Sequence, residues 1–370
     1  MPTPTGDRDD LDAHWMSRAL TAATRGPAAD PNPRVGCVVV SATGELLSTG
    51  WHRGAGTPHA EVNAITGAQG DLTGATAYVT LEPWNHTGRT PPCTDALLGA
   101  GIARVVQATD DPNASASGGA ARLRRNGVTV RSGVLADAAH DLNHTWLHRN
   151  RTGRPWVIWK YASTLDGRSA ARDGTSRWIT GPEAHTDVHQ RRSRCGAIVV
   201  GTGTALVDDP RLTVRDGSQD PGHPPLRVVM GRRRLPPTAR VLDDAAPTLV
   251  HDGRDPTVLL AELAARGVHA VWLEGGPTLA AAFLRAGLVD EVISYLAPML
   301  FGAGAPALSD LGIQSLSEAV RLQLTDVSRL GDDIRLISRP APRHSSAAGE
   351  AANKPANKPA DGPPNRSEPH

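Results

Sequence analysis

The sequence predicts an α/β fold that is divided into two successive domains. Short apolar runs of strand length alternate with helix-like segments along most of the chain, which is typical of sheets covered by helices on both faces. The chain has 370 residues, more than one ordinary domain needs. A polar stretch with glycine and proline, Arg151–Pro155, is typical of a linker. We therefore expect one domain over residues 10–150 and a second over residues 155–340.

The predicted elements of the first half begin with a helix over Asp10–Arg25, because Leu11, Trp15, Leu20 and Ala23 recur at helical spacing. Two prolines then interrupt the chain before the first strand. Apolar runs of strand length follow at Val35–Val40, Ala77–Leu81, Ile102–Ala108 and Val128–Arg131. Helix-like segments lie at His59–Ala68, Thr94–Ala100, Gly119–Asn126 and Leu135–Arg149. This order predicts a sheet between two layers of helices.

The second half repeats the alternation. Strands are predicted at Trp156–Tyr161, Ala197–Gly201, Leu226–Met230, Thr248–His251, His269–Leu273 and Glu291–Ala297. Helices are predicted at Pro182–Arg194, Pro256–Arg266 and Thr278–Ala286. Residues 341–370 repeat Ala-Asn-Lys-Pro and are rich in Pro, Ala, Ser and Asn. Such a composition cannot bury a core, so we expect a disordered tail there.

Composition and charge exclude several classes of protein. The formal net charge of +1 gives no general attraction to nucleic acid or to an anionic membrane. No run approaches the ~20 apolar residues of a membrane span, and the N-terminus lacks the pattern of a signal peptide. Three scattered cysteines are too few for a disulfide framework. We therefore expect a cytoplasmic protein that acts on a small molecule.

A pattern for hydrolytic deamination stands in the first half. His59 and Glu61 form a His-x-Glu sequence at the start of a predicted helix, and Cys93 follows a proline at the start of another. Zinc-dependent base deaminases carry this order of residues. Zinc in such sites has three protein ligands and a bound water, whose proton a separate carboxylate transfers. The sequence thus predicts His59 and Cys93 as zinc ligands and Glu61 as the catalytic proton carrier.

Trp84 occupies the remaining ligand position of this pattern, where a second proline-led cysteine is expected. An indole N–H donates a hydrogen bond and offers no lone pair to a metal. With only His59 and Cys93 left, we expect weak binding of Zn²⁺ and an impaired or inactive hydrolytic site. His86 is a candidate substitute ligand if the loop that carries it shifts.

Several longer motifs resemble those of one family. In the first half they are Pro31-Asn32-Pro33-x-Val35-Gly36, His59-Ala60-Glu61-Val62-Asn63-Ala64 and Glu82-Pro83-x-x-His86-x-Gly88-Arg89-Thr90-Pro91-Pro92-Cys93. In the second half they are Lys160–Arg168, Ser176–Thr180 and Gly201–Arg215. Over roughly residues 10–340 the chain resembles the bifunctional riboflavin-biosynthesis deaminase–reductase (RibD) family. The family motif has cysteine where this chain has Trp84.

The resemblance implies a fold and two reactions. The fold is a cytidine-deaminase-like α/β/α sandwich followed by a dihydrofolate-reductase-like α/β domain. The first domain of the family removes an amino group hydrolytically from 2,5-diamino-6-ribosylamino-4-pyrimidinone 5′-phosphate. The second reduces the ribosyl chain of 5-amino-6-(5-phosphoribosylamino)uracil with NADPH. The resemblance also implies a phosphorylated pyrimidine as substrate and a homo-oligomer.

The resemblance implies residue roles in the second half as well. The residues that would contact NADPH are Ala162, Trp178, Thr204, Asp208, Gly276, Pro277 and Thr278. Those that would contact the substrate are Ser176, Arg192, Leu212, Arg215 and Glu274.

These roles have physical reasons. A glycine turn at the start of a helix lets backbone N–H groups approach a phosphate. Paired arginines can bind a phosphate through two hydrogen bonds each. Arg232 follows a predicted strand, and we add it as a candidate contact of the NADPH 2′-phosphate.

Three other interpretations of the sequence stay open. A relocated ligand would restore both activities. A specialised homologue in secondary metabolism would act on a related pyrimidine or pterin-like compound. A first half without catalysis would serve as an interaction module. A nucleic-acid-editing deaminase also carries His-x-Glu, but it needs a basic surface, which the near-neutral charge argues against.

Overall fold

The computed structural model describes residues 5–86, 91–113, 117–176, 178–215 and 224–341. The first half of the chain forms a five-stranded sheet with the strand order β2-β1-β3-β4-β5. Its strands are β1 (Gly36–Val40), β2 (Leu46–Trp51), β3 (Thr76–Val79), β4 (Arg104–Gln107) and β5 (Thr129–Arg131). β1 is antiparallel to β2 and β3, whereas β3, β4 and β5 are parallel.

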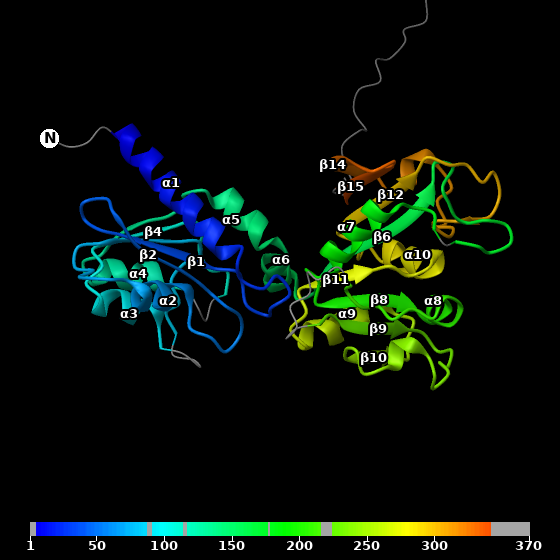
Figure 1. Ribbon diagram of the computed structural model, residues 1–370, viewed down its shortest axis with the longest axis horizontal. Helices are drawn as coiled ribbons and strands as arrows, with labels where there is room; N and C mark the ends of the chain where they lie inside the picture. Colours follow the sequence, from blue (N-terminus) through cyan, green and yellow to red (C-terminus); the bar gives the residue numbers. More distant parts are fainter. Residues whose placement is uncertain (1–4, 87–90, 114–116, 177, 216–223, 342–370) are drawn as a thin grey trace, which may run out of the picture. The chain divides into compact units, whose positions relative to one another are not determined.

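Helices cover both faces of this sheet (Figure 1). They are α1 (Thr5–Ala23), α2 (Ala60–Gly67), α3 (Cys93–Gly99), α4 (Gly119–Arg125), α5 (Ala136–Leu142) and α6 (His144–Thr152). Successive side chains of a strand point to opposite faces. In β1, Val38 packs in a core with Met16 of α1, and Val39 packs in another with Leu97 of α3. The predicted α/β/α sandwich is confirmed.

The second half forms an eight-stranded sheet with the order β10-β9-β8-β11-β6-β12-β15-β14. The strands from β10 to β12 in this order are parallel. β15 pairs antiparallel with β12, and β14 pairs antiparallel with β15. The parallel strands are β6 (Trp156–Thr164), β8 (Ala197–Gly201), β9 (Leu226–Met230), β10 (Thr248–His251), β11 (Ala270–Leu273) and β12 (Glu291–Ala297). The antiparallel strands are β14 (Leu322–Leu330) and β15 (Asp333–Pro340).

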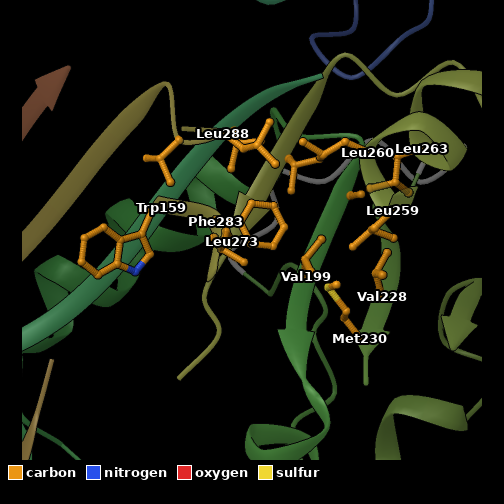
Figure 2. Close-up of a cluster of buried hydrophobic side chains, with 14 of the residues drawn as sticks. Trp159, Val199, Val228, Met230, Leu259, Leu260, Leu263, Leu273, Phe283 and Leu288 are labelled. Atoms are coloured by element: carbon orange, nitrogen blue, oxygen red, sulfur yellow. The ribbon is translucent and has the colours of Figure 1, made fainter. Parts of the chain in front are cut away.

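The helices of this half are α7 (Pro182–Arg192), α8 (Thr202–Asp208), α9 (Pro256–Ala265) and α10 (Pro277–Arg285). Figure 2 shows the core between the sheet and helices α9 and α10, where Val199 and Leu273 meet Leu259 and Phe283. Val188 of α7 and Trp272 belong to the core on the other face. Burying a leucine or phenylalanine in such a core contributes about 1.5–3 kcal/mol. The predicted α/β fold of this half is also confirmed.

The structure differs from the sequence prediction in several elements. It adds β2, α8, the hairpin β14–β15 and a two-stranded sheet of β7 (Arg168–Ala170) and β13 (Ala305–Pro306). β14 escapes a search for apolar runs because one of its faces is exposed and polar residues alternate along it. The predicted helix over residues 135–149 is two helices, α5 and α6, that break at Asn143. The predicted disordered tail covers residues 341–370, of which 342–370 lie outside the described residues.

Candidate functional site

The first group of predicted site residues converges at the starts of two helices. His59 immediately precedes α2, Glu61 is in its first turn, and Cys93 is the first residue of α3. Both helices pack on the same face of the five-stranded sheet. The ligand atoms of the three residues lie within 4.8 Å of one another, and His59 Nδ1 is 3.2 Å from Cys93 Sγ. The structure therefore brings these three side chains together, as the sequence predicts.

Burial dominates the electrostatics of this group. It raises the pKa of Glu61 to about 7. It also raises the pKa of the Cys93 thiol well above its usual range, and the neighbouring Glu61 adds to that shift. Burial lowers the pKa of His59. All three shifts favour the neutral forms, so a cation in this group would have to stabilise the thiolate that burial disfavours.

Trp84 lies at the edge of the group and offers it no electron pair. Its ring contacts the ring of His59 edge-on, with centroids 5.7 Å apart. Its indole N–H donates to the backbone carbonyl of His86. The His86 side chain is exposed, with its ring centroid 6.2 Å from that of Trp84.

The donors present do not fit the catalytic zinc arrangement, which needs three ligands and a separate carboxylate. Within the described residues, His59, Glu61 and Cys93 form the one group of at least three donors with suitable spacing. Glu61 would have to serve both as third ligand and as proton carrier. The part of the proline-rich motif at residues 87–90 lies outside the described residues.

Glu82 supports this region, a role that sequence reasoning missed. Its buried carboxylate accepts hydrogen bonds from the backbone N–H groups of Gly118 and Ala120, at 3.1 and 3.0 Å. A Cβ atom at Gly119 would fall 2.0 Å from the carbonyl oxygen of Pro83. The chain just before Trp84 is therefore fixed against the start of α4. The signal for this role was the Glu-Pro pair of the motif.

A second group lies at the carboxyl end of the eight-stranded sheet. Glu274 follows β11, and its carboxylate forms a 2.5 Å ion pair with Arg192 at the end of α7. Burial alone would raise the pKa of Glu274, but Arg192 and Lys160 of β6 hold it below its usual range. Burial lowers the pKa of Lys160, and Glu274 opposes that shift. Lys160 is the first residue of the motif over residues 160–168, and the sequence predicted no role for it.

Residues 212–215 bring a second arginine to this group. Arg192 donates to the carbonyl of Thr213 at 3.3 Å, and Arg215 Nη2 lies 3.5 Å from His189 Nε2 on α7. Burial and then the charge of Arg192 lower the pKa of Arg215. Leu212 is buried, with its backbone at a φ of 52°. Two cations whose charges interact in this way favour a bound anion.

The predicted cofactor residues lie around two neighbouring turns. Gly276 caps α10, and its N–H donates to the Thr204 hydroxyl of α8 at 3.2 Å. Pro277 and Thr278 are the first residues of α10, and Asp208 is the last of α8. The start of α10 suits the diphosphate of a dinucleotide, because the helix dipole and the backbone N–H groups that follow Pro277 favour negative charge.

Of the remaining predicted residues, one lies on β6 and three are exposed. Ala162 is on β6, two residues after Lys160 and on the same face of that strand. Ser176 is exposed, and Trp178 is 73% exposed, with its ring 4.7 Å from that of His185. Arg232 is exposed after β9.

Arg233, the residue after Arg232, lies against one of the cofactor turns. A Cβ atom at Gly203 would fall 2.6 Å from a terminal nitrogen of Arg233. Gly203 is next to Thr204 in α8, so the guanidinium of Arg233 covers the first turn of that helix. Among the described residues, no helix is both long and apolar enough to cross a lipid bilayer.

Comparisons with known proteins match each half of the chain to a known domain. The zinc-binding region of cytidine and deoxycytidylate deaminases matches residues 9–109, and the RibD C-terminal domain matches residues 155–336. Riboflavin biosynthesis protein RibD of Mycobacterium tuberculosis is 49% identical over 310 residues, which cover 83% of this chain and 90% of the relative. The protein of the same name from Escherichia coli is 40% identical over 361 residues, with coverage of 88% and 98%.

Solved structures of related proteins have the same fold over most of the chain. Acinetobacter baumannii RibD has a TM-score of 0.84 at 39% identity and covers 90% of this chain and 100% of its own. A diaminohydroxyphosphoribosylaminopyrimidine deaminase/5-amino-6-(5-phosphoribosylamino)uracil reductase from Thermotoga maritima has a TM-score of 0.83 at 32% identity, with coverage of 90% and 100%. The chain therefore belongs to the RibD family of riboflavin biosynthesis, whose members join a zinc-type deaminase domain to an NADPH-using reductase domain.

Proposed function

We propose that the working activity of this chain is the NADPH-dependent reduction of the ribosyl chain of 5-amino-6-(5-phosphoribosylamino)uracil. The observation that carries the proposal is the ion pair of Arg192 and Glu274, with side chains 14% and 9% exposed, beside Lys160 and Arg215. The substrate is the one that the Thermotoga maritima neighbour is named for. This group offers cations for a phosphate and a carboxylate for sugar hydroxyls.

The residue roles follow from this arrangement. Arg192 and Arg215 would bind the substrate phosphate, and Glu274 would accept hydrogen bonds from the sugar. Leu212 and Ser176 complete the proposed substrate contacts. When bound, NADPH supplies the hydride. The protein orients the two reactants and keeps Glu274 ionised through Arg192 and Lys160.

The proposed cofactor residues surround the turns at α8 and α10. Gly276, Pro277 and Thr278 would hold the diphosphate, and the hydroxyl of Thr204 fixes their turn by accepting from the N–H of Gly276. The other proposed contacts of NADPH are Ala162, Trp178, Asp208 and Arg232. Arg233 supports the placement of the 2′-phosphate on this side, because its guanidinium covers the first turn of α8.

The test is an assay of the purified full chain with NADPH and the phosphoribosylaminouracil. We expect NADPH to be consumed in proportion to the substrate added. The same compound without its phosphate should show a raised KM, because Arg192 and Arg215 would lose their partner. Absence of NADPH consumption with the phosphorylated compound would refute the proposal and favour a different pyrimidine as substrate.

The second part of the proposal concerns the first domain, in which we expect hydrolytic deamination to be impaired. Two metal donors, His59 and Cys93, remain beside Trp84. Recruiting Glu61 as the third ligand would restore the donor count but would remove the proton carrier. Either arrangement lacks one part of the hydrolytic site, so we assign no deamination step to these residues.

The third part is assembly into a homo-oligomer. The exposed face of the sheet at its antiparallel end is apolar, with Leu322, Leu324, Val327 and Ile334 each at least 39% exposed. Next to it is a cavity of about 460 Å³ that includes Leu296 of β12. A second copy of the chain could cover this exposed apolar face and pack along the edge strand. Light scattering of the purified protein would test this.

Domain limits and location complete the proposal. The strands of the first sheet lie within residues 36–131 and those of the second within residues 156–340, which supports limits of 10–150 and 155–340. Limited proteolysis would test whether residues 151–155 are cut first. All three cysteines are free, which supports a reducing, cytoplasmic location that cell fractionation would test.

A further inference from the structure

Two residues with a strained backbone lie three positions apart in the chain, just before Thr213 and Arg215 of the proposed substrate site. Asp209 has a φ of 39° and Leu212 a φ of 52°. Among the described residues, one other non-glycine residue, Leu135, has a positive φ. Residues with side chains persist in this conformation when surrounding contacts hold them there, and such residues cluster at functional sites. The contacts that hold residues 209–212 therefore matter for the site.

Arg227 of β9 supplies one of those contacts from inside the protein. Its side chain is fully buried, and Nη1 donates to the carbonyl of Arg211, between the two strained residues, at 3.4 Å. The same nitrogen donates to the carboxylate of Asp243 at 2.6 Å. Nη2 donates to the backbone carbonyls of Asp243 and Ala246. One guanidinium thus joins the segment before β9 to the segment after it.

A second contact joins the same two segments. The carboxylate of Asp209 accepts a hydrogen bond from the N–H of Arg240 at 2.8 Å. Nη1 of Arg227 also lies 3.5 Å from the carbonyl oxygen of Arg240. The segment at residues 240–246 is therefore a platform, and Arg227 and Asp209 fix the strained segment onto it.

The strained segment leads directly into the proposed substrate residues. Leu212 is buried in the core with Val229 and Val241. The next residue, Thr213, accepts from Arg192, which is ion-paired with Glu274. A shift of the Arg211 carbonyl would move Leu212 and Thr213 with it, because they are adjacent in the chain.

We propose that Arg227 is a positioning residue of the reductase, which fixes residues 209–215 so that Leu212 and Arg215 meet the phosphorylated pyrimidine. This proposal rests on the reductase function proposed above. Arg227 acts through the segment and not on the substrate. A planar guanidinium can donate in several directions at once, whereas an ammonium is a compact charge that cannot reach the same set of acceptors. A lysine at position 227 would keep the buried positive charge beside Asp243 but could not donate to the same set of carbonyl groups.

The test compares Arg227→Lys with the wild-type full chain. We expect the KM for the phosphoribosylaminouracil to rise about tenfold or more, because small misplacements of binding groups weaken substrate binding strongly. We expect the KM for NADPH and kcat to stay within about twofold, because Arg227 contacts the chain at Arg211, after Asp208, and takes no part in the hydrogen bond between Gly276 and Thr204 at the cofactor turns. The melting temperature is measured on the same samples.

Arg104→Lys is the matched control. Arg104 pairs with the buried Asp12 in the first sheet, at 2.6 Å, so the exchange also perturbs a buried ion pair. It should lower the melting temperature and leave both KM values unchanged. Asp209→Ala provides a second variant if Arg227→Lys fails to fold, because it removes the acceptor for Arg240 near the surface. It should raise the same KM.

The outcomes separate this inference from the proposed function. A folded Arg227→Lys or Asp209→Ala enzyme with an unchanged KM for the pyrimidine would overturn the inference. A rise in both KM values together with a fall in kcat would also overturn it, because a merely structural role predicts that pattern. A wild-type chain without reductase activity would contradict the proposed function instead.

Discussion

The indole of Trp84 lies edge-on to His59, with ring centroids 5.7 Å apart, where the family motif has a metal-binding cysteine. The other parts of the site are in place, because His59, Glu61 and Cys93 converge within 4.8 Å. Glu82 also fixes the chain before Trp84 through buried hydrogen bonds. At the scale of single residues, the question is whether one missing thiolate is enough to cause the weak zinc binding that we propose.

Replacement of Trp84 by cysteine answers this question. We expect Trp84→Cys to bind about one zinc per chain and to release ammonia from the diaminopyrimidinone, because three ligands and a free Glu61 are then present. The wild-type protein should hold far less zinc under the same conditions. Metal content by atomic absorption and ammonia release by a coupled assay are the measurements.

Trp84→Ala is the control for this exchange. It removes the bulk of the indole and adds no electron pair, so its zinc content should be as low as that of the wild type. Equal zinc in the alanine and cysteine variants would mean that bulk, and not the missing donor, excludes the metal. Full zinc and normal deamination in the wild type would contradict the proposed impairment.

At the scale of elements, α1 is held on the first sheet by a buried carboxylate. Asp12 of α1 accepts from Arg104 of β4 at 2.6 and 2.7 Å and from Arg131 of β5 at 2.8 Å. The hydroxyl of Tyr78 in β3 donates to it as well. Burial alone would raise the pKa of Asp12, but Arg104 with its neighbours holds it below the usual range. One side chain of the helix thus connects three strands.

Asp12→Asn should lower the free energy of unfolding by about 3–5 kcal/mol at neutral pH, because it leaves the buried side of Arg104 without a counter-charge. The folded pKa of Asp12 is depressed, so its contribution is present above the unfolded pKa of about 4 and disappears as the pH falls through the folded value. The difference between wild type and variant should therefore shrink in acid. Urea unfolding at neutral and acidic pH measures it.

Asp9→Asn is the matched control for α1. Asp9 also pairs with Arg131, at 2.6 Å, but its side chain is 62% exposed. Exposed ion pairs contribute about 0–1 kcal/mol, so this exchange should change stability little. Equal losses in the two variants would show that α1 does not depend on the buried carboxylate.

At the scale of the whole molecule, we propose that copies of the chain assemble through the antiparallel end of the second sheet. β14 is an edge strand of nine residues, and its exposed face carries apolar side chains. Isolated exposed apolar residues are common, but a row of them along an edge strand marks an interaction surface. We therefore expect two copies to meet along this face.

Val327→Glu on β14 should dissociate the assembly, because a carboxylate would have to leave water to enter the contact. Val258→Glu on α9 is the matched control, since Val258 and Val327 are 54% and 58% exposed. The control should leave the molar mass unchanged. Light scattering at several protein concentrations measures both. A monomeric wild type, or a variant with the mass of the wild type, would contradict the proposed surface.

Much of the fold could be predicted from local patterns. Helices α2 and α3 and strands such as β8 and β12 were expected close to their observed limits, because their apolar spacing is regular and their flanks hold proline or glycine. β14 and β2 could not be found in this way. Their residues are partly exposed, and their pairing partners determine that they are strands.

The candidate site also has features that the sequence alone determined and features that only the tertiary structure decided. The sequence alone determined the donor set, because a tryptophan cannot offer a lone pair in any fold. It also determined the family, since the motifs of both halves are long and ordered. Tertiary structure decided which charges meet: Glu274 with Arg192, and Arg227 with the carbonyls on either side of β9. Such contacts join residues distant in the chain, and their energies depend on burial and distance, which no local pattern records.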